Sequence, residues 1–420
     1  MNLKRRLNLK IRLISIINLL ALLMIWRSNY CTSVFVSAYS SGLFMLTFIV
    51  WFFMASRVDR FFLSDLLKQS STLLVFIMIN IILNLIFLGT VDQETINYII
   101  VFIFCSILIF YDHFQEILLK KIVILIILID TAIKAIVTIG ALEVNPGIVK
   151  QMSVAGASDM ENYRVLIADY STVYVCVLIT VFLVSILGIT KKRVYQLIDI
   201  VFLVIFGFFL FKCSFFFALL LLVYGIVGAV FIKENRMFVI LPIIGILVVL
   251  VFRGLISDFC YYMAQQPYWS EIIQGKWNDM ALFLGQGAEA AYMSDMRLEL
   301  MYQSWETFLA RPFFGIYSLN INTLSIGKHS AWLDGLGNYG IFRFPLFIVF
   351  LVKIFKRLAD KLYDPKAVYI SISIFCLLSI VNPHVFPQMW VFFMAIIPFV
   401  TDIVQEANQK WEKSTSKSVL

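Results

Sequence analysis

His329 is the residue of this chain best suited to acid–base chemistry. It stands between Lys328 and Ser330, near the end of a polar stretch, residues 254–331, in a chain that is otherwise strongly apolar. An imidazole has an unperturbed pKa of about 6.5 and can therefore take a proton near neutral pH. We expect His329 to act as a general base that removes the proton from an attacking hydroxyl group. The alternative is a purely structural role, in which His329 is a polar residue hydrogen-bonded to water or to a neighbouring carbonyl group.

Two arginines in polar parts of the chain are suited to binding phosphate, because a guanidinium presents a planar fork of donors that matches phosphate oxygens. Arg297 lies in residues 288–310, where apolar side chains recur at helical spacing. Trp305 follows it by eight positions, so both lie along one face of the predicted helix. Arg164 lies in a second polar segment, residues 142–170, and is alternatively an anchor at lipid headgroups.

The composition places these residues in a membrane protein. Hydrophobic residues make up 61% of the 420 residues and charged residues 14%, which excludes a soluble globular chain. A bilayer core of about 30 Å is crossed by about 17–25 apolar residues, and only helices satisfy their backbone there. We expect one all-α polytopic domain, residues 1–420, with about twelve spans. The predicted spans are residues 13–26, 34–55, 73–89, 96–111, 122–141, 171–189, 197–211, 214–232, 237–252, 332–352, 367–381 and 386–404.

The basic residues predict the orientation of these spans. Residues 197–232 form an apolar stretch too long for one span, and two short spans that turn at Lys212 keep both basic flanks on one side. Most of the 34 Lys and Arg residues then fall on the side that holds both termini, which the positive-inside rule predicts to be cytoplasmic. Segments 142–170 and 254–331 lie outside, the latter between the ninth and tenth spans. The net charge of +8 thus needs no nucleic-acid partner.

The order of residues in the long polar segment resembles the O-antigen polymerase and ligase superfamily. Two patterns carry this resemblance: Arg, Trp, Pro and Gly, and then His and Ser followed after nine residues by Gly. The matching residues are Arg297, Trp305, Pro312, Gly315, His329, Ser330 and Gly340. The chain departs from the family at Tyr317, where a second glycine is common, and at Arg343, where a small or hydroxylated residue is common.

The resemblance implies a glycosyltransferase of GT-C-like architecture in the bacterial cytoplasmic membrane. Such an enzyme joins oligosaccharide repeat units carried by undecaprenyl diphosphate, on the outer face and without metal or another cofactor, to build capsule, exopolysaccharide or O antigen. Its implied partners are the lipid-linked oligosaccharide, the bilayer, a flippase and a chain-length regulator. The implied catalytic residues are His329, Arg297 and Arg164, and the implied substrate-binding residues are Ser330, Lys328, Trp305, Tyr339, Gly340 and Arg343.

Other interpretations of the same features stay open. A ligase of the superfamily moves finished glycan to a different acceptor, and a lipid-linked oligosaccharide flippase also has about twelve spans. A flippase, however, usually shows two related halves and polar residues at the midplane. Lys328 and Arg343 are alternatively interfacial anchors. Asp130 and Lys134, four positions apart in a predicted span, form either an internal ion pair or a polar lining for substrate.

The remaining histidines and the cysteines predict no further site. His113 falls on the predicted cytoplasmic side, and His384, next to Pro383, is more readily a turn residue than a ligand. The 6 cysteines occur singly, without the paired spacing of a metal or redox site. We therefore expect neither a bound metal nor a disulfide framework.

Overall fold

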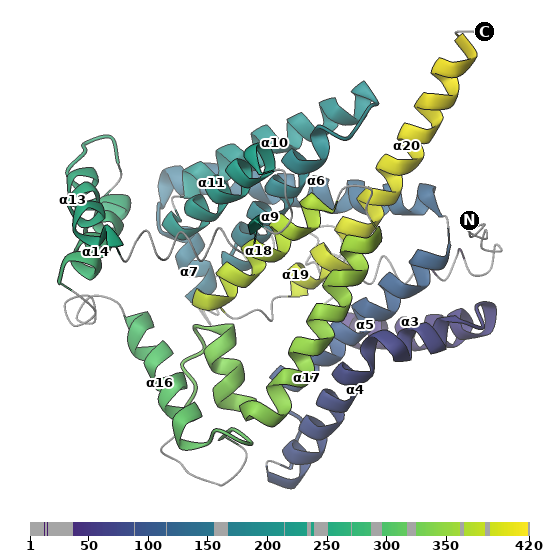
Figure 1. Ribbon diagram of the computed structural model, residues 1–420, viewed down its shortest axis with the longest axis horizontal. Helices are drawn as coiled ribbons and strands as arrows, with labels where there is room; N and C mark the ends of the chain where they lie inside the picture. The colour runs from purple at the N-terminus through teal and green to yellow at the C-terminus, as the bar shows by residue number, and fades with distance from the viewer. Residues whose placement is uncertain are drawn as a thin grey trace.

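The computed structural model of the chain is built from helices. The residues that it describes are 12, 15, 37–87, 89–114, 116–154, 167–213, 215–232, 237–238, 251–269, 271–286, 296–316, 325–361, 365–382 and 387–418. These residues form helices joined by turns, and no strand occurs among them. Figure 1 shows long helices crossing in one body, with the α13 and α14 pair at one edge. The all-α prediction is therefore confirmed.

The helices follow the predicted apolar runs closely. Every predicted run contains a helix except residues 13–26 and 237–252, most of which lie outside the described residues. The helices in the runs are α3 (Ser37–Val58), α4 (Phe62–Phe87), α5 (Gln93–His113), α6 (Ile117–Val144), α9 (Tyr170–Leu187), α10 (Arg193–Cys213), α11 (Phe216–Phe231), α17 (Ala331–Lys361), α18 (Lys366–Val381), α19 (Pro387–Val391), the π-helical η3 (Phe392–Ile396) and α20 (Ile397–Ser418).

Six segments of the described chain are long and apolar enough to cross a membrane, as judged by length and composition. They are Phe62–Phe87, Glu94–His113, Ile117–Val144, Tyr170–Leu187, Arg193–Cys213 and Met389–Lys413. Shorter apolar helices cover Met45–Val58, Phe217–Phe231 and Lys366–Val381. The fold thus has the helices that a multi-pass membrane protein requires.

The predicted break near Lys212 is present. Helix α10 ends at Cys213, and α11 begins at Phe216. Both helices pack against α9, which is buried along most of its length. Residues 197–232 therefore form two helices, as their excessive length for a single span predicted.

The two polar segments also contain helices. In residues 142–170, α6 continues to Val144 and α7 covers Ile148–Val154. The long segment contains α13 (Arg253–Ala264), which packs against α14 (Glu271–Gln286), and α16 (Met296–Ala310), which packs against α17. Helix α16 ends two residues before Pro312, where the sequence predicts an end.

Asp130 and Lys134 form the predicted ion pair within α6. The Lys134 Nζ lies 3.7 Å from the Asp130 Oδ2, and both side chains are buried. Because an isolated charge is costly inside an apolar helix bundle, pairing at positions i and i+4 lowers that cost.

Helices α4, α5 and α17 form the scaffold of the candidate site. Asn80 and Asp65 of α4 contact Arg343 and Arg357 of α17, so these two helices run antiparallel. Helix α5 runs parallel to α17, because its first turn meets Tyr339 and its last turn meets Arg357. Between these ends lies an aromatic core in which the rings of Tyr98 and Phe347 are 4.9 Å apart. The polar ends are about 21 Å apart along α17.

Candidate functional site

A turn after α16 interlocks with a break in α17. The amide groups of Ile341 and Phe342 donate hydrogen bonds to the carbonyl oxygens of Pro312 (2.8 Å) and Phe313 (3.2 Å). These amides are available because Gly340, with φ 64° and ψ −176°, interrupts the helical backbone. We call this contact between residues 312–315 and the break at Gly340 the glycine junction. It joins two parts of the predicted motif, and their glycines, Gly315 and Gly340, are 25 positions apart in the chain.

Both positions of the junction require glycine, because the backbone conformation disfavours a side chain and because there is no room for a Cβ atom. Gly315 has φ 71°, a backbone conformation that residues other than glycine rarely adopt. A Cβ atom on Gly315 would lie 2.2 Å from the Asn338 carbonyl oxygen, and one on Gly340 would lie 2.4 Å from that of Phe313. The glycine at each motif position therefore allows two backbones to touch.

Arg343 clamps the glycine junction from within. Its guanidinium donates to the carbonyl oxygens of Tyr339 (3.2 Å), Asn338 (2.7 Å) and Phe314, and to the Asn80 Oδ1 (2.6 Å). The side chain is only 2% exposed, and its guanidinium carbon lies 5.3 Å from the centre of the Tyr339 ring. These contacts give Arg343 a structural role, because one side chain ties α4, the turn and both halves of α17 together. A contact with substrate stays a prediction.

His329 is half-buried in a tight turn that leads into α17. Ser330 caps the helix, since its Oγ accepts from the Leu333 amide at 3.4 Å. Asp334 in the first turn reaches back, and its Oδ2 accepts from the Ser330 amide at 3.1 Å. Lys328 has φ 58°, a conformation that costs free energy in a residue with a side chain and that clusters at functional sites. We call residues 328–330 the His329 turn.

The His329 turn is held against α16 by buried polar contacts. The Ser304 hydroxyl of α16 donates to the Asp334 Oδ1 at 2.6 Å and accepts from the Gly327 amide at 2.9 Å. Gly327 passes so close to α16 that an added Cβ would lie 1.9 Å from the Leu300 carbonyl oxygen. The turn therefore has a defined position relative to α16 and α17.

Glu94, in the first turn of α5, brings a carboxylate to this region. Its Oε2 accepts hydrogen bonds from the Asn338 Nδ2 and from the Tyr339 hydroxyl, each at 3.1 Å. Lys328 and Asp334 both interact electrostatically with Glu94, which relates this carboxylate to the His329 turn. The region thus combines an imidazole and an exposed ammonium group from the His329 turn with a half-buried carboxylate from α5, which is distant in sequence.

The predicted site residues fall into three groups. Those of α17 and the turn before it, Lys328 to Arg343, lie along one connected structure with the glycine junction. Trp305 lies on α16, is 38% exposed and packs against Phe308. Arg297 is the second residue of α16, but its side chain lies outside the described residues, as do Arg164 and His384.

Sequence reasoning missed Glu94, Asp334, Asn80 and Ser304 as parts of this site. Asp334 had a local signal, because an acidic residue in the first turn after a serine is typical of a helix start. Asn80 and Glu94 had only a weak one, a polar residue within or at the mouth of an apolar run. Which of these residues face one another depends on how α4, α5 and α17 pack.

The described part of the chain offers no stronger site for other chemistry. Among its residues, no three His, Cys, Asp or Glu side chains group as a metal site. His113 lies at the opposite end of the scaffold and pairs with Asp59 and Asp65. The His329 turn and the glycine junction are therefore the strongest candidate site near the predicted motif.

Comparison with known proteins adds no assignment. No protein-family model matches the chain, and no curated protein matches it.

Proposed function

We propose that this chain is a membrane glycosyltransferase that joins oligosaccharide repeat units carried on undecaprenyl diphosphate. The proposal includes about twelve spans in a GT-C-like arrangement, both termini in the cytoplasm, and a reaction on the outer face of the bacterial cytoplasmic membrane. The product is a capsular polysaccharide, an exopolysaccharide or an O antigen. Its support is the resemblance of the motif together with the geometry around His329.

One observation carries the proposal. The separate parts of the motif meet in space, since the turn at Pro312 and Gly315 docks on the break at Gly340 through backbone hydrogen bonds. The same segment of α17 begins at the His329 turn, which Asp334 and Ser304 hold in position. A motif whose glycines permit close backbone contact, on a helix that begins directly after a half-buried histidine, supports a built site better than it supports a connecting loop.

The proposed reaction is a displacement at the anomeric carbon of the donor. The acceptor hydroxyl oxygen bonds to that carbon, the bond from the carbon to the diphosphate oxygen breaks, and the bonding electrons leave with the diphosphate. His329 takes the proton of the hydroxyl group. Arg297 and Arg164 compensate the charge that develops on the leaving diphosphate, and Lys328 is a further cation for it.

The remaining predicted residues bind or shape the substrate site in this proposal. Trp305 offers an exposed ring on which a sugar face can pack. Ser330, Tyr339 and Gly340 shape the start of α17, where Tyr339 already donates to Glu94. Glu94 is placed to orient polar groups of this region, and we include it in the site on the basis of its contacts.

Reconstitution with a defined donor tests the function. Purified protein in lipid vesicles receives synthetic undecaprenyl-diphosphate repeat units, with neither nucleotide sugar nor added metal, and the products are separated by size. A ladder of lengthening lipid-linked products supports a polymerase. Transfer of glycan only to a different acceptor selects the ligase, and movement of the donor across the vesicle membrane without elongation selects the flippase.

A further inference from the structure

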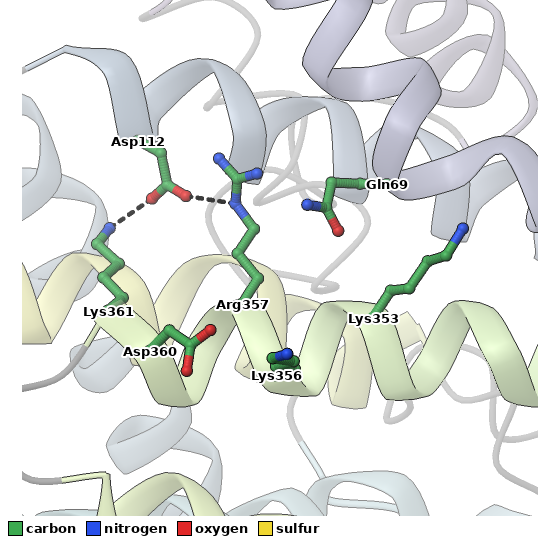
Figure 2. A pocket seen from close by; sticks show the side chains of 7 residues that line it. All are labelled: Gln69, Asp112, Lys353, Lys356, Arg357, Asp360 and Lys361. Carbon is green, nitrogen blue, oxygen red and sulfur yellow. Dashed lines mark hydrogen bonds and ion pairs between the residues drawn. The ribbon is translucent and has the colours of Figure 1, made fainter.

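A second polar region lies at the far end of α17 from the glycine junction. It surrounds a cavity of about 470 Å³ between α4, α5 and α17. The charged residues that line it are Lys353, Lys356, Arg357, Asp360, Lys361 and Asp112. Figure 2 shows that the α17 residues project from one stretch of helix, while Asp112 and Gln69 approach from the facing helices. We call this space the basic cavity.

The basic cavity has an excess of positive charge. Its lining holds four cationic side chains against two carboxylates, which leaves a formal charge of +2. The cations recur on α17 at relative positions 0, 3, 4 and 8, so they share one face of the helix. Such a row of cations in a concave surface attracts an anion.

Two of the four cations are already neutralised within the protein. Arg357 donates to Asp112 (2.8 Å) and Asp65 (2.9 Å), and Lys361 lies 2.6 Å from Asp112 and 3.2 Å from Asp402. This network fixes the back wall of the cavity. The buried Lys120 pairs with the same Asp402, which leaves that carboxylate little capacity for another cation.

The other two cations have no carboxylate partner in the described part of the chain. Lys353 makes two long contacts of 3.5 Å, with the Lys68 carbonyl oxygen and the Ser71 hydroxyl. Lys356 is exposed and forms no ion pair with a described residue. Asp360, which also lines the cavity, forms no ion pair with a described residue either. The unpaired charged groups of the lining are therefore Lys353, Lys356 and Asp360, with a combined charge of +1.

An apolar surface begins where the cations end. Val349 and Val352, in the turn of α17 before Lys353, are 44% and 61% exposed. Exposed aliphatic side chains are suited to contact the acyl chains of a bilayer. The basic cavity thus stands at a boundary between apolar and polar surface.

We propose that the basic cavity binds the phosphate headgroup of an anionic membrane lipid, with its acyl chains along Val349 and Val352 of α17. Lys353 and Lys356 contact the phosphate, and Gln69 supplies an amide donor. No aromatic ring is among the residues that line the cavity, which disfavours a nucleotide, because nothing there stacks on a base. The bound lipid joins α4 to α17 and does not depend on the proposed glycosyl transfer.

Lipid binding to the purified full-length chain tests this proposal. Native mass spectrometry counts phosphatidylglycerol and phosphatidylcholine adducts on the wild-type protein and on Lys353→Gln/Lys356→Gln. We expect the protein to prefer phosphatidylglycerol, and the double variant to lose about 25-fold in affinity, at about fivefold for each lysine. Lys150→Gln/Lys192→Gln removes two exposed lysines elsewhere and should retain the wild-type affinity.

Further variants control for misfolding, and a competition experiment distinguishes a lipid phosphate from free inorganic phosphate. Lys353→Arg/Lys356→Arg should restore binding, because it keeps both charges. Lys356→Gln alone removes an exposed side chain without an ion pair to described residues, so it should fold normally and still lose about fivefold in affinity. Equal affinity for the two lipids, or equal binding by the double variant and its control, overturns the proposal. If inorganic phosphate prevents lipid binding when it is added at the same concentration as the lipid, the cavity binds a soluble anion, and this result also overturns the proposal.

Discussion

Helix α17 carries one arginine just after its break at Gly340 and another near its C-terminal end, and their side chains are satisfied in opposite ways. Arg343 donates to three main-chain carbonyl groups and to the amide of Asn80, whereas Arg357 pairs with the carboxylates of Asp65 and Asp112. Neutral acceptors orient a guanidinium without cancelling its charge, and they hold the backbone that supplies them. Carboxylates cancel the charge and depend less on backbone shape. The contacts of Arg343 therefore hold the bend in α17, whereas those of Arg357 form an ion-pair network between helices.

His329 and His113 lie in correspondingly different surroundings. His329 occupies a strained turn with defined contacts at the glycine junction end, while His113 takes part in ion pairs at the other end. Strain held by surrounding contacts is typical of functional sites, whereas an ion-pair network stabilises packing. Each of the following predictions tests this division, beginning with the largest effect.

His329→Ala should reduce repeat-unit elongation by about 100-fold or more, because a positioned general base contributes about 10² to 10⁴ to rate. Elongation of the synthetic lipid-linked donor measures the effect, and the amount of protein in the membrane should be unchanged. His113→Ala is the matched control and should lower thermal stability while elongation per folded protein is retained. Near-normal elongation by His329→Ala would remove His329 from the mechanism.

Arg343→Met should destabilise the protein by about 3 kcal/mol, because the buried Asn80 amide and several carbonyl groups lose their donor. Thermal unfolding in detergent, followed by size-exclusion chromatography, measures the change. Arg193→Met, at an exposed position, should leave the unfolding temperature nearly unchanged. A normal unfolding temperature with lost elongation would instead assign Arg343 a direct role with substrate.

Gly340→Ala should destabilise the glycine junction by about 2 kcal/mol, since a side chain disfavours the positive φ and its Cβ would collide with the Phe313 carbonyl. Gly207→Ala in α10 is the control: an added Cβ meets nothing within 4 Å there, so this change should be neutral or slightly stabilising. The same thermal assay compares them, and equal effects of the two substitutions would contradict a special role for the junction.

Arg357→Met should have the smallest effect of the series, about 1 to 2 kcal/mol. Asp112 keeps Lys361 as a partner at 2.6 Å, and Asp65 keeps His113 at 3.3 Å, so neither carboxylate is left alone. The unfolding temperature should therefore fall less than in Arg343→Met. A larger fall in unfolding temperature would mean that the ion-pair network of Arg357, and not the glycine junction, contributes most to the stability of this scaffold.

Much of the fold was predictable because its signals are local. Apolar runs of a length that crosses a bilayer indicate helices wherever they occur, and their positions match helices in the described chain. Residues 197–232 were too long for one span and have basic residues on both flanks, and these two features together predicted the break that lies between Cys213 and Phe216. Pro312 likewise marked the end of α16, because proline cannot continue a helix.

The candidate site was predictable only in part. The motif identified Gly315, Gly340 and the His329 turn, since these residues carry fixed spacing along the chain. It did not indicate that the two glycines allow one backbone to rest on another. Arg343 was predicted to bind substrate or to anchor the helix, and its enclosure by carbonyl groups was not foreseen, because those acceptors come from segments with no local relation to it.

The sequence by itself determined the helical class, the apolar runs and the break near Lys212, because each depends on residues near one another in the chain. It placed Asp130 and Lys134 on one helical face but left open whether they pair, and the structure shows the pair. Only the tertiary structure decided that Glu94 and Asn80 face α17, and that four cations of that helix open into a cavity. Those relations depend on the rotation and register of packed helices. Side-chain packing over the whole interface sets that register, and spacing within one run does not contain it.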